Sequence, residues 1–380
     1  MKSSFRNFVA ISILVPLALF ALLCFFGSVA RAQTAQPAAG TFVKTALGGF
    51  ILGYDIDQNG SEGLLSESLT LSDGNFDVAT ETFDQTSGKI LKIVTQQTET
   101  KNDFVTFGIF GTSVGLVEQE KSKGIFVGKR LYATMNPVSG NKFTGKWTPP
   151  LTKNQLIIGV APSQNATNMA LLVSQNFNSF VMSSNVAANT FGPVVNLTDQ
   201  IFGFNDSPVI AIDNATNQAV VAASNGGILE SPKVAVADLT TGNVTEFQGI
   251  GFGFANGIAV DSADGIAVTS TEIDFSLEFY DLATQTGFVV PLHNATNQSQ
   301  SGGAVAFDPV NKLFLVGQEF SSTAASGSSI QVFDTKGNFV KAINGLSLPA
   351  SPAYMALNPA KRFGYVIVTP ALTQLQSFTY

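Results

Sequence analysis

Residues 208–224, PVIAIDNATNQAVVAAS, consist of two short apolar runs separated by a polar stretch. Val, Ile and Ala fill both runs, and Asp213, Asn214 and Asn217 lie between them. Apolar runs bounded by Asn, Asp and Gly are typical of strands joined by tight turns, whereas a helical period is almost absent beyond the N-terminal segment. The stretch therefore predicts a β-hairpin.

The hairpin pattern recurs in NGIAVDSADGIAVTS (256–270), GAVAFDPVNKLFLVG (303–317) and AYMALNPAKRFGYVIV (353–368). The turns open at Asp213, Asp261, Asp308 and Asn358, which are 48, 47 and 50 residues apart. Within each of the first three units a second hairpin follows, as in VAVADLTTGNVTEF, LEFYDLATQTGFVV and IQVFDTKGNFVKAI. Four strands in about 40–50 residues is the period of a β-propeller blade.

We expect an all-β protein with a β-propeller of seven four-stranded blades. An earlier copy of the first hairpin places Pro162 at the turn, and two weaker copies centre on Asp84 and Gln119. The spacing of these N-terminal copies is irregular, so six blades is the alternative count.

The ring is predicted to be closed by the N- and C-terminal segments, because residues 373–380, TQLQSFTY, occupy a third-strand position with no fourth strand after them. Residues 48–68, GGFILGYDIDQNGSEGLLSES, are the expected closing segment. We therefore predict a short linker over residues 33–46 and a single propeller domain over residues 47–380.

The repeats resemble the YVTN-type propeller repeats of exported proteins, a group that includes lactonase-like seven-bladed propellers. The resemblance rests on AVVAASN, LFLVGQE, VAVADLTTGN and IQVFDTKGN, and the last of these is also similar to an NHL repeat. These motifs are structural, so the resemblance implies a fold more than an activity.

Residues 1–32 have the parts of a secretory signal peptide. Lys2 and Arg6 precede or flank an apolar run, and Ala30 and Ala32 precede the expected cleavage point. We expect a secreted or periplasmic protein with no membrane insertion after cleavage; a retained anchor helix is the alternative. Cys24, the single cysteine, lies in this segment, and the formal net charge of −7 argues against a nucleic-acid partner.

Asp55, Asp57, Asn59 and Gly60 have the alternating spacing of a calcium loop. Position 12 of an EF-hand loop should be a bidentate Glu, but here it is Ser66. Aligning Asp55 with Asp281 and Asp334 instead predicts a turn between the third and fourth strands of a blade. Ca²⁺ bound at the Asp55–Asn59 turn is the less favoured reading, and we predict no other cofactor or metal.

Polar side chains that follow the second strands are the candidate ligand-binding residues: Gln175, Asn225, Glu272 and Glu319. Equivalent positions on different blades lie at the same height around the axis, so these groups could converge on one face. His293 is the only histidine, and no GxSxG nucleophile elbow occurs, so we assign no catalytic residues. The predicted function is a non-catalytic scaffold that binds a protein, glycan or surface component; the alternative is a lactonase-like hydrolase that uses Glu272 and Glu319.

Overall fold

The structure of the protein is a computed structural model. The structure describes residues 40–56, 62–99, 103–110, 113–122, 125–132, 150–151, 155–162, 168–175, 178–185, 188, 190–197, 208–223, 231–251, 253, 255–271, 276–293, 302–318, 329–346, 348, 354–368 and 372–380. The predicted signal peptide, residues 1–32, lies outside this part of the chain. Within the described ranges, no helix has the length and apolar character needed to cross a membrane.

The described strands form antiparallel sheets that follow one another along the chain. The sheets before residue 200 contain β2 (Phe50–Ile56), β3 (Glu62–Thr70), β4 (Phe76–Asp84) and β5 (Ile90–Glu99); β6 (Asp103–Phe110), β7 (Ser113–Ser122) and β8 (Ile125–Tyr132); and β9 (Leu156–Pro162), β10 (Asn168–Gln175), β11 (Asn178–Asn185) and β12 (Thr190–Leu197). In each sheet, strands that are adjacent in sequence are hydrogen-bonded neighbours.

The C-terminal half continues the same order. Its sheets contain β13 (Val209–Asp213), β14 (Gln218–Ala223), β15 (Lys233–Asp238) and β16 (Val244–Gln248); β17 (Ala255–Asp261), β18 (Ile266–Thr271), β19 (Ser276–Asp281) and β20 (Thr286–Pro291); β21 (Gly302–Asp308), β22 (Leu313–Gln318), β23 (Ser329–Asp334) and β24 (Phe339–Asn344); and β25 (Met355–Asn358), β26 (Phe363–Val368) and β27 (Gln374–Thr379) with β1 (Phe42–Lys44). A short 3₁₀ helix, Pro359–Lys361, forms the turn between β25 and β26.

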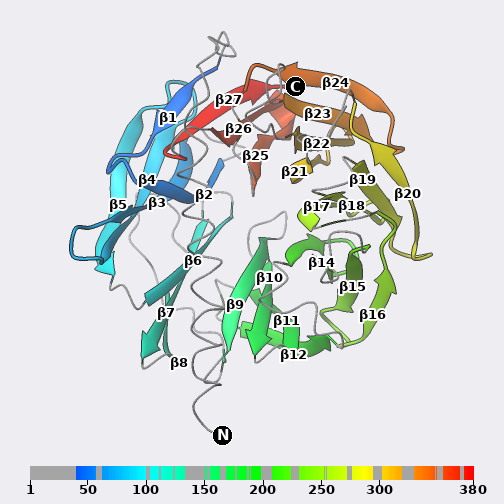
Figure 1. Cartoon of the computed structure of the whole chain (residues 1–380), viewed down its shortest axis with the longest axis horizontal. Coiled ribbons are helices and arrows are strands. Elements are labelled where there is room, and N and C mark those ends of the chain that lie inside the picture. Colours follow the sequence, from blue (N-terminus) through cyan, green and yellow to red (C-terminus); the bar gives the residue numbers. More distant parts are fainter. Residues whose placement is uncertain are drawn as a thin grey trace, which may run out of the picture.

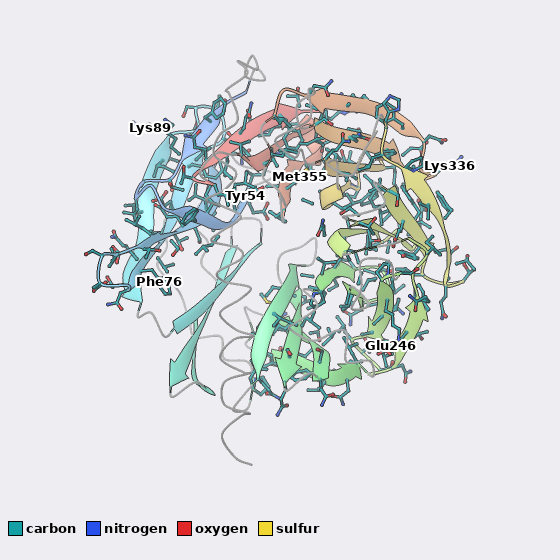
Figure 2. All side chains as sticks on the ribbon, viewed as in Figure 1. Tyr54, Phe76, Lys89, Glu246, Lys336 and Met355 are labelled. Atoms are coloured by element: carbon teal, nitrogen blue, oxygen red, sulfur yellow. The ribbon has the colours of Figure 1, made fainter. Side chains whose placement is uncertain are left out.

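The sheets are arranged around a closed ring, which Figure 1 shows in sequence order from blue to red. The first strand of each sheet contacts the first strand of the next: β2 with β6, β6 with β9, β9 with β13, β13 with β17, β17 with β21, β21 with β25, and β25 with β2. Figure 2 shows side chains packed between neighbouring blades from β13 to β27. The predicted β-propeller fold is confirmed.

The prediction of seven four-stranded blades is wrong. The described residues form six four-stranded blades, and the remaining sheet, β6–β7–β8, has three strands. The irregular spacing of the N-terminal copies made the number of blades uncertain. The copy around Gln119 lies within β7 and not at a turn between first and second strands. The copy around Asp84 is the turn between β4 and β5, the third and fourth strands of its blade.

Ring closure uses a strand upstream of the predicted segment. β1 pairs antiparallel with β27, with Val43 opposite Leu375, and supplies the fourth strand of the last blade. β1 lies within residues 33–46, the predicted short linker. The predicted closing segment instead provides β2 and β3, the first two strands of the next blade. Asp55 therefore belongs to a first strand, and its alignment with Asp281 and Asp334 is wrong.

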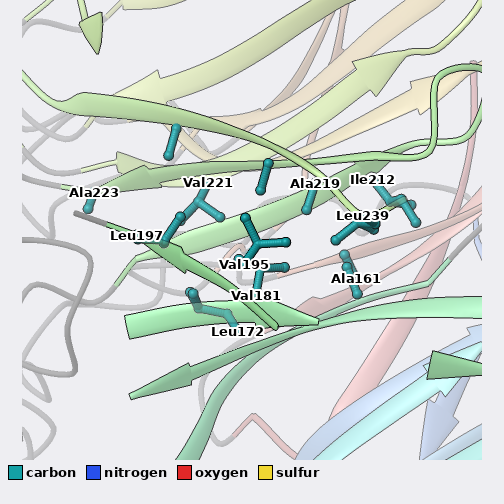
Figure 3. Packing of buried hydrophobic residues seen from close by; sticks show 13 residues of the cluster. Ala161, Leu172, Val181, Val195, Leu197, Ile212, Ala219, Val221, Ala223 and Leu239 are labelled. Carbon is teal, nitrogen blue, oxygen red and sulfur yellow. The ribbon is translucent and has the colours of Figure 1, made fainter. Parts of the chain in front are cut away.

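Packing between adjacent blades buries apolar side chains of both. In Figure 3, Leu172 and Val181 of one blade lie beside Val221 and Ala219 of the next, and all four are fully buried. Small residues in the β13–β16 blade face Leu and Val in its neighbour, which allows the two twisted sheets to approach closely. The core is therefore a series of sheet-to-sheet interfaces around the ring.

The turns between first and second strands also connect one blade to the next. Asp213, Asp261, Asp308 and Asn358 are 1% exposed or less. The Asn214 backbone N–H donates to Ser262 Oγ at 2.9 Å, and Asn311 Nδ2 donates to Pro359 O at 3.1 Å. Lys312 Nζ lies 2.8 Å from Asp261 Oδ1. The aspartate repeat of the sequence therefore marks buried turns that join adjacent blades.

The turns between third and fourth strands are closed by a second set of aspartates. Asp238 accepts hydrogen bonds from the N–H groups of Thr240 and Thr241, at 2.8 and 2.9 Å, and Asp281 bonds Ala283 and Thr284 in the same way. These N–H donors hold the pKa of both carboxyls below the usual range, because they favour the charged form. Each side chain closes its own turn.

Candidate functional site

The four predicted ligand-binding residues follow second strands, and one of them lies in the described part of the chain. Gln175, at the end of β10, is half-buried, and its Oε1 accepts a hydrogen bond from Gln155 Nε2 at 3.0 Å. Asn225, Glu272 and Glu319 lie outside the described residues. Convergence of the four side chains therefore remains a prediction.

The two faces of the ring differ in the length of their connections. In the four C-terminal blades, first and second strands are joined by four residues each: 214–217, 262–265, 309–312 and 359–362. On the opposite face of these blades, four of the second-to-third and fourth-to-first connections have nine or ten residues, 224–232, 292–301, 319–328 and 345–354, whereas 249–254, 272–275 and 369–373 have six, four and five. In an up-and-down sheet these two kinds of connection start from the same ends of the strands, so we call this side the long-connection face. Gln175, the last residue of β10, lies at its edge.

Two buried glutamines hold one of the long connections in the β21–β24 blade; we call Gln318 and Gln331 the amide clasp. Gln331 Oε1 accepts the His293 backbone N–H at 2.8 Å, and its Nε2 donates to His293 O at 2.9 Å. The same Nε2 donates to Gln318 Oε1 at 2.7 Å. Both side chains are at most 4% exposed. One amide therefore satisfies the N–H and the carbonyl of the residue that it binds.

Two buried glutamates occupy the equivalent place in the β2–β5 blade; we call Glu67 and Glu81 the acid clasp. Glu67 Oε1 accepts the Leu47 N–H at 2.7 Å, and Oε2 accepts the Gly49 N–H at 2.8 Å. The two oxygens of Glu81 lie 3.3 and 3.2 Å from the Ala46 nitrogen. Both carboxyls are 0% exposed. They hold the connection between β1 and β2, at which the two ends of the ring meet.

Burial and the neighbouring carboxyl control the ionisation of the acid clasp. Desolvation, followed by the hydrogen bond and the charge of Glu67, raises the pKa of Glu81 to about 8. The Ala46 N–H opposes this shift but does not overcome it. Glu81 is therefore neutral at pH 7 and can donate its proton to Glu67, whose oxygens both accept backbone N–H groups.

A third polar group lies at the same position in the β17–β20 blade. Glu278 is fully buried, and its Oε2 accepts hydrogen bonds from Thr269 Oγ1, at 3.0 Å, and from the Tyr280 hydroxyl. The Tyr280 oxygen in turn lies 3.4 Å from the Ile250 nitrogen, on the connection between β16 and β17. Burial raises the pKa of Tyr280 far above its ordinary value, so the phenol stays protonated.

The clasps occupy one position of the repeat. Glu81, Glu278 and Gln331 each precede the turn aspartate of their third strand by three residues. Glu67 and Gln318 stand opposite Ala79 and Ser329 in equivalent registers. None of these residues is among the four candidates predicted from the sequence. The sequence contains a pattern that could have identified them, namely a polar residue in the third strand, three residues before the turn aspartate.

The Asp55 turn holds no described metal site. Asp55 Oδ1 accepts the Ile56 N–H at 2.8 Å, and Asp55 contributes to raising the pKa of Tyr354. Residues 57–60, which complete the predicted Ca²⁺ loop, lie outside the described residues. Within the parts of the chain that the structure describes, no group of three or more His, Cys, Asp or Glu side chains has a metal-binding arrangement.

His293, the single histidine, lies at the start of the connection that the amide clasp holds. Its exposed imidazole stacks on Phe339 with ring centroids 4.0 Å apart and an interplanar angle of 13°. Its backbone, rather than its ring, makes the contacts with Gln331. The stack places the connection against the outer strand β24.

No protein-family model matches the sequence, and no curated protein matches it. Among solved structures, the chain is similar to the Cps50 (Swd1) β-propeller domain of Myceliophteria thermophila. The TM-score is 0.57 and the identity 9%, over 90% of this chain and 99% of that domain. Similarity at this identity defines the class of protein, a β-propeller, and carries no activity across. The YVTN, lactonase-like and NHL resemblances remain predictions.

Proposed function

We propose that this chain is an exported β-propeller that binds a protein, glycan or surface component through its long-connection face, without catalysis. The single observation that supports this function is the difference between the two faces. One face consists of short turns closed by aspartates, whereas on the other face several connections have nine or more residues, and the amide clasp holds His293 near the start of one of them. Binding residues are often found on loops that a rigid scaffold positions.

Gln175, Asn225, Glu272 and Glu319 are the proposed contact residues. They are amides and carboxylates, which can pair with sugar hydroxyls, backbone amides or basic side chains. An interaction role agrees with the fold, since propellers present a broad surface at each face. Export follows from the signal-peptide pattern of residues 1–32. N-terminal sequencing of the secreted protein should find Gln33 as the first residue.

The test begins with a glycan array and a displayed peptide library, both screened with the purified mature protein. We expect ligands whose affinity falls about tenfold or more, about 1.4 kcal/mol, in the triple variant Asn225→Ala/Glu272→Ala/Glu319→Ala. The matched control, Thr284→Ala/Lys336→Ala, alters two exposed residues of the opposite face and should retain full affinity. Equal affinity in the two variants would contradict the proposed face.

The hydrolase alternative is tested in parallel. A panel of lactones and esters is incubated with the wild type in the presence of Ca²⁺, Mg²⁺, Mn²⁺ or Zn²⁺. Hydrolysis that Glu272→Ala or Glu319→Ala abolishes, with retained melting temperature, would replace the binding function by a catalytic one. We expect no turnover above that of the triple variant.

A further inference from the structure

We propose that Glu67 and Glu81 share one proton as a pH-sensitive latch, which holds the β1–β2 connection against the first blade and releases it when the proton is lost. The latch would couple mildly alkaline pH to opening of the ring at the place where its two ends meet. The inference is independent of the binding function, because it concerns only closure of the fold.

The geometry assigns the proton. Two carboxylates that are both buried and adjacent repel each other, and each is costly to desolvate. Glu67 accepts backbone N–H groups at 2.7 and 2.8 Å, one on each of its two oxygens, so both oxygens act as acceptors. Glu81 lies more than 3 Å from its backbone donor and carries the raised pKa. The shared proton therefore sits on Glu81 and points to Glu67.

The backbone of the connection is shaped to present its donors to the two carboxyls. Gly48 has φ of +76°, a left-handed conformation that other residues adopt at a cost. A Cβ atom at Gly49 would meet the Ser68 carbonyl oxygen at 2.4 Å, so only glycine fits. This conformation brings the N–H groups of Ala46, Leu47 and Gly49 to one side. Loss of the acceptors would leave these donors without their partners.

Within the described residues, no counter-charge compensates a second negative charge. Neither Glu67 nor Glu81 forms an ion pair with a lysine or arginine of the described chain. The β1–β2 connection itself, residues 45–49, has no ionisable side chain. Ionisation of Glu81 would therefore place two negative charges in one buried site.

The other ionisable groups of the packed elements face elsewhere or stay neutral. The buried phenols on this side of the blade, Tyr54, Tyr354 and Tyr365, all have a pKa raised by burial and remain protonated. The remaining charged side chains that the structure describes in β1–β5 are exposed or half-buried: Lys44, Asp55, Glu62, Asp77, Asp84, Lys89 and Lys92. The acid clasp is therefore the group whose charge changes between neutral and mildly alkaline pH.

The sign of the effect follows from proton linkage. Between the ordinary glutamate pKa of 4.5 and about 8, the folded state binds more protons than the unfolded state. The free energy of unfolding therefore falls as pH rises through this interval, and the contribution of Glu81 is lost above it. Local opening of the connection follows the same rule: between the ordinary pKa of 4.5 and about 8, each pH unit favours opening by up to about tenfold, and above about 8 the dependence levels off.

The test is amide hydrogen exchange of the wild type from about pH 5 to about pH 9, corrected for the intrinsic pH dependence of exchange. We expect protection at Ala46, Leu47 and Gly49 to fall as pH rises to about 8 and then to level off. Protection at His293, which the amide clasp holds, should stay constant and serves as the internal control. Constant protection at all four residues would overturn the proposal.

Two variants separate the shared proton from general alkaline loosening. In Glu81→Gln, the amide replaces the proton as a donor to Glu67, so the connection should stay protected up to about pH 9. In Glu67→Gln, Glu81 loses its acidic neighbour but stays buried, so the pH dependence should weaken and its upper limit should move to lower pH. Either variant suffices if the other fails to fold. A folded variant that keeps the wild-type pH dependence would exclude the latch.

Discussion

The acid clasp and the amide clasp perform the same structural task with different chemistry. Each uses side chains at equivalent positions of a second and a third strand to hold the connection that enters its blade. Gln331 binds both the N–H and the carbonyl of His293, so the amide clasp needs no proton from solvent. The acid clasp accepts three backbone N–H groups but contains two carboxyls, and therefore depends on one bound proton.

The difference lies at a particular place in the ring. The amide clasp holds a connection between two blades that are continuous in sequence, whereas the acid clasp holds the connection that follows the closing strand β1. β1 has three residues, and Val43 is its fully buried side chain. The proposed pH-dependent contact therefore lies beside the short strand on which ring closure depends.

The largest expected effect comes from breaking the burial of β1. Val43→Asp places a carboxylate among apolar side chains of the first and last blades, including Leu65 and Leu375. We expect a loss of about 3 kcal/mol or more in the free energy of unfolding, measured by denaturant titration. Phe42→Asp on the exposed side of the same strand should cost less than about 1 kcal/mol. Equal losses would mean that β1 does not close the ring as a half-buried strand.

An intermediate effect is expected from converting the amide clasp toward an acid clasp. Gln331→Glu removes the donor to His293 O and Gln318, and should lower the free energy of unfolding by about 1–3 kcal/mol at pH 7. The new carboxyl would be buried, so its neutral form would be favoured and stability should recover as pH falls. Gln331→Met should be destabilising by a similar amount at every pH. If the free energy of unfolding of Gln331→Glu did not change with pH, burial at this position would not control ionisation of the new carboxyl.

The smallest effect is expected on the opposite face, where charge also links two blades. Lys312→Met removes the ion pair with Asp261, and the lysine side chain is 40% exposed. Asp261 is 1% exposed but keeps the hydrogen bond from the Ala263 N–H at 3.1 Å, and the lysine end of the pair is solvated, so we expect a loss of about 0.5–1 kcal/mol that diminishes in high salt. A loss as large as that of Gln331→Glu would mean that both faces depend equally on buried polar contacts.

Much of the fold could be predicted from the sequence because the repeated turns are formed by contacts between residues that are close in sequence. Asp213, Asp261 and Asp308 mark turns between the first and second strands, and Asp238, Asp281 and Asp334 mark turns between the third and fourth. In both sets the aspartate binds N–H groups two or three residues further on. Such turns depend on neighbouring residues only, so their positions can be read directly.

The errors arose where local chemistry was ambiguous. Asp55 resembled a turn aspartate, yet Tyr54 and Asp55 lie in β2, a first strand whose Tyr54 hydroxyl donates to Tyr354 O across the ring closure. An aspartate such as Asp84 can close a turn between first and second strands or between third and fourth strands in the same way. Its hydrogen bonds to nearby N–H groups therefore do not show which of the two turns it belongs to. Assigning a strand its order within a blade requires knowing which strands pair, and pairing across the closure joins residues that are distant in sequence.

By itself, the sequence determined the strand-and-turn repeat, the β-propeller class and the aspartates that close the turns, because each depends on contacts between near neighbours. Tertiary structure alone decided that β1 closes the ring, that six blades have four strands, and that Glu67 and Glu81 meet. These outcomes depend on which buried surfaces lie together. Burial also changes what a residue does, since the same glutamate that would be charged in water holds a proton between two strands.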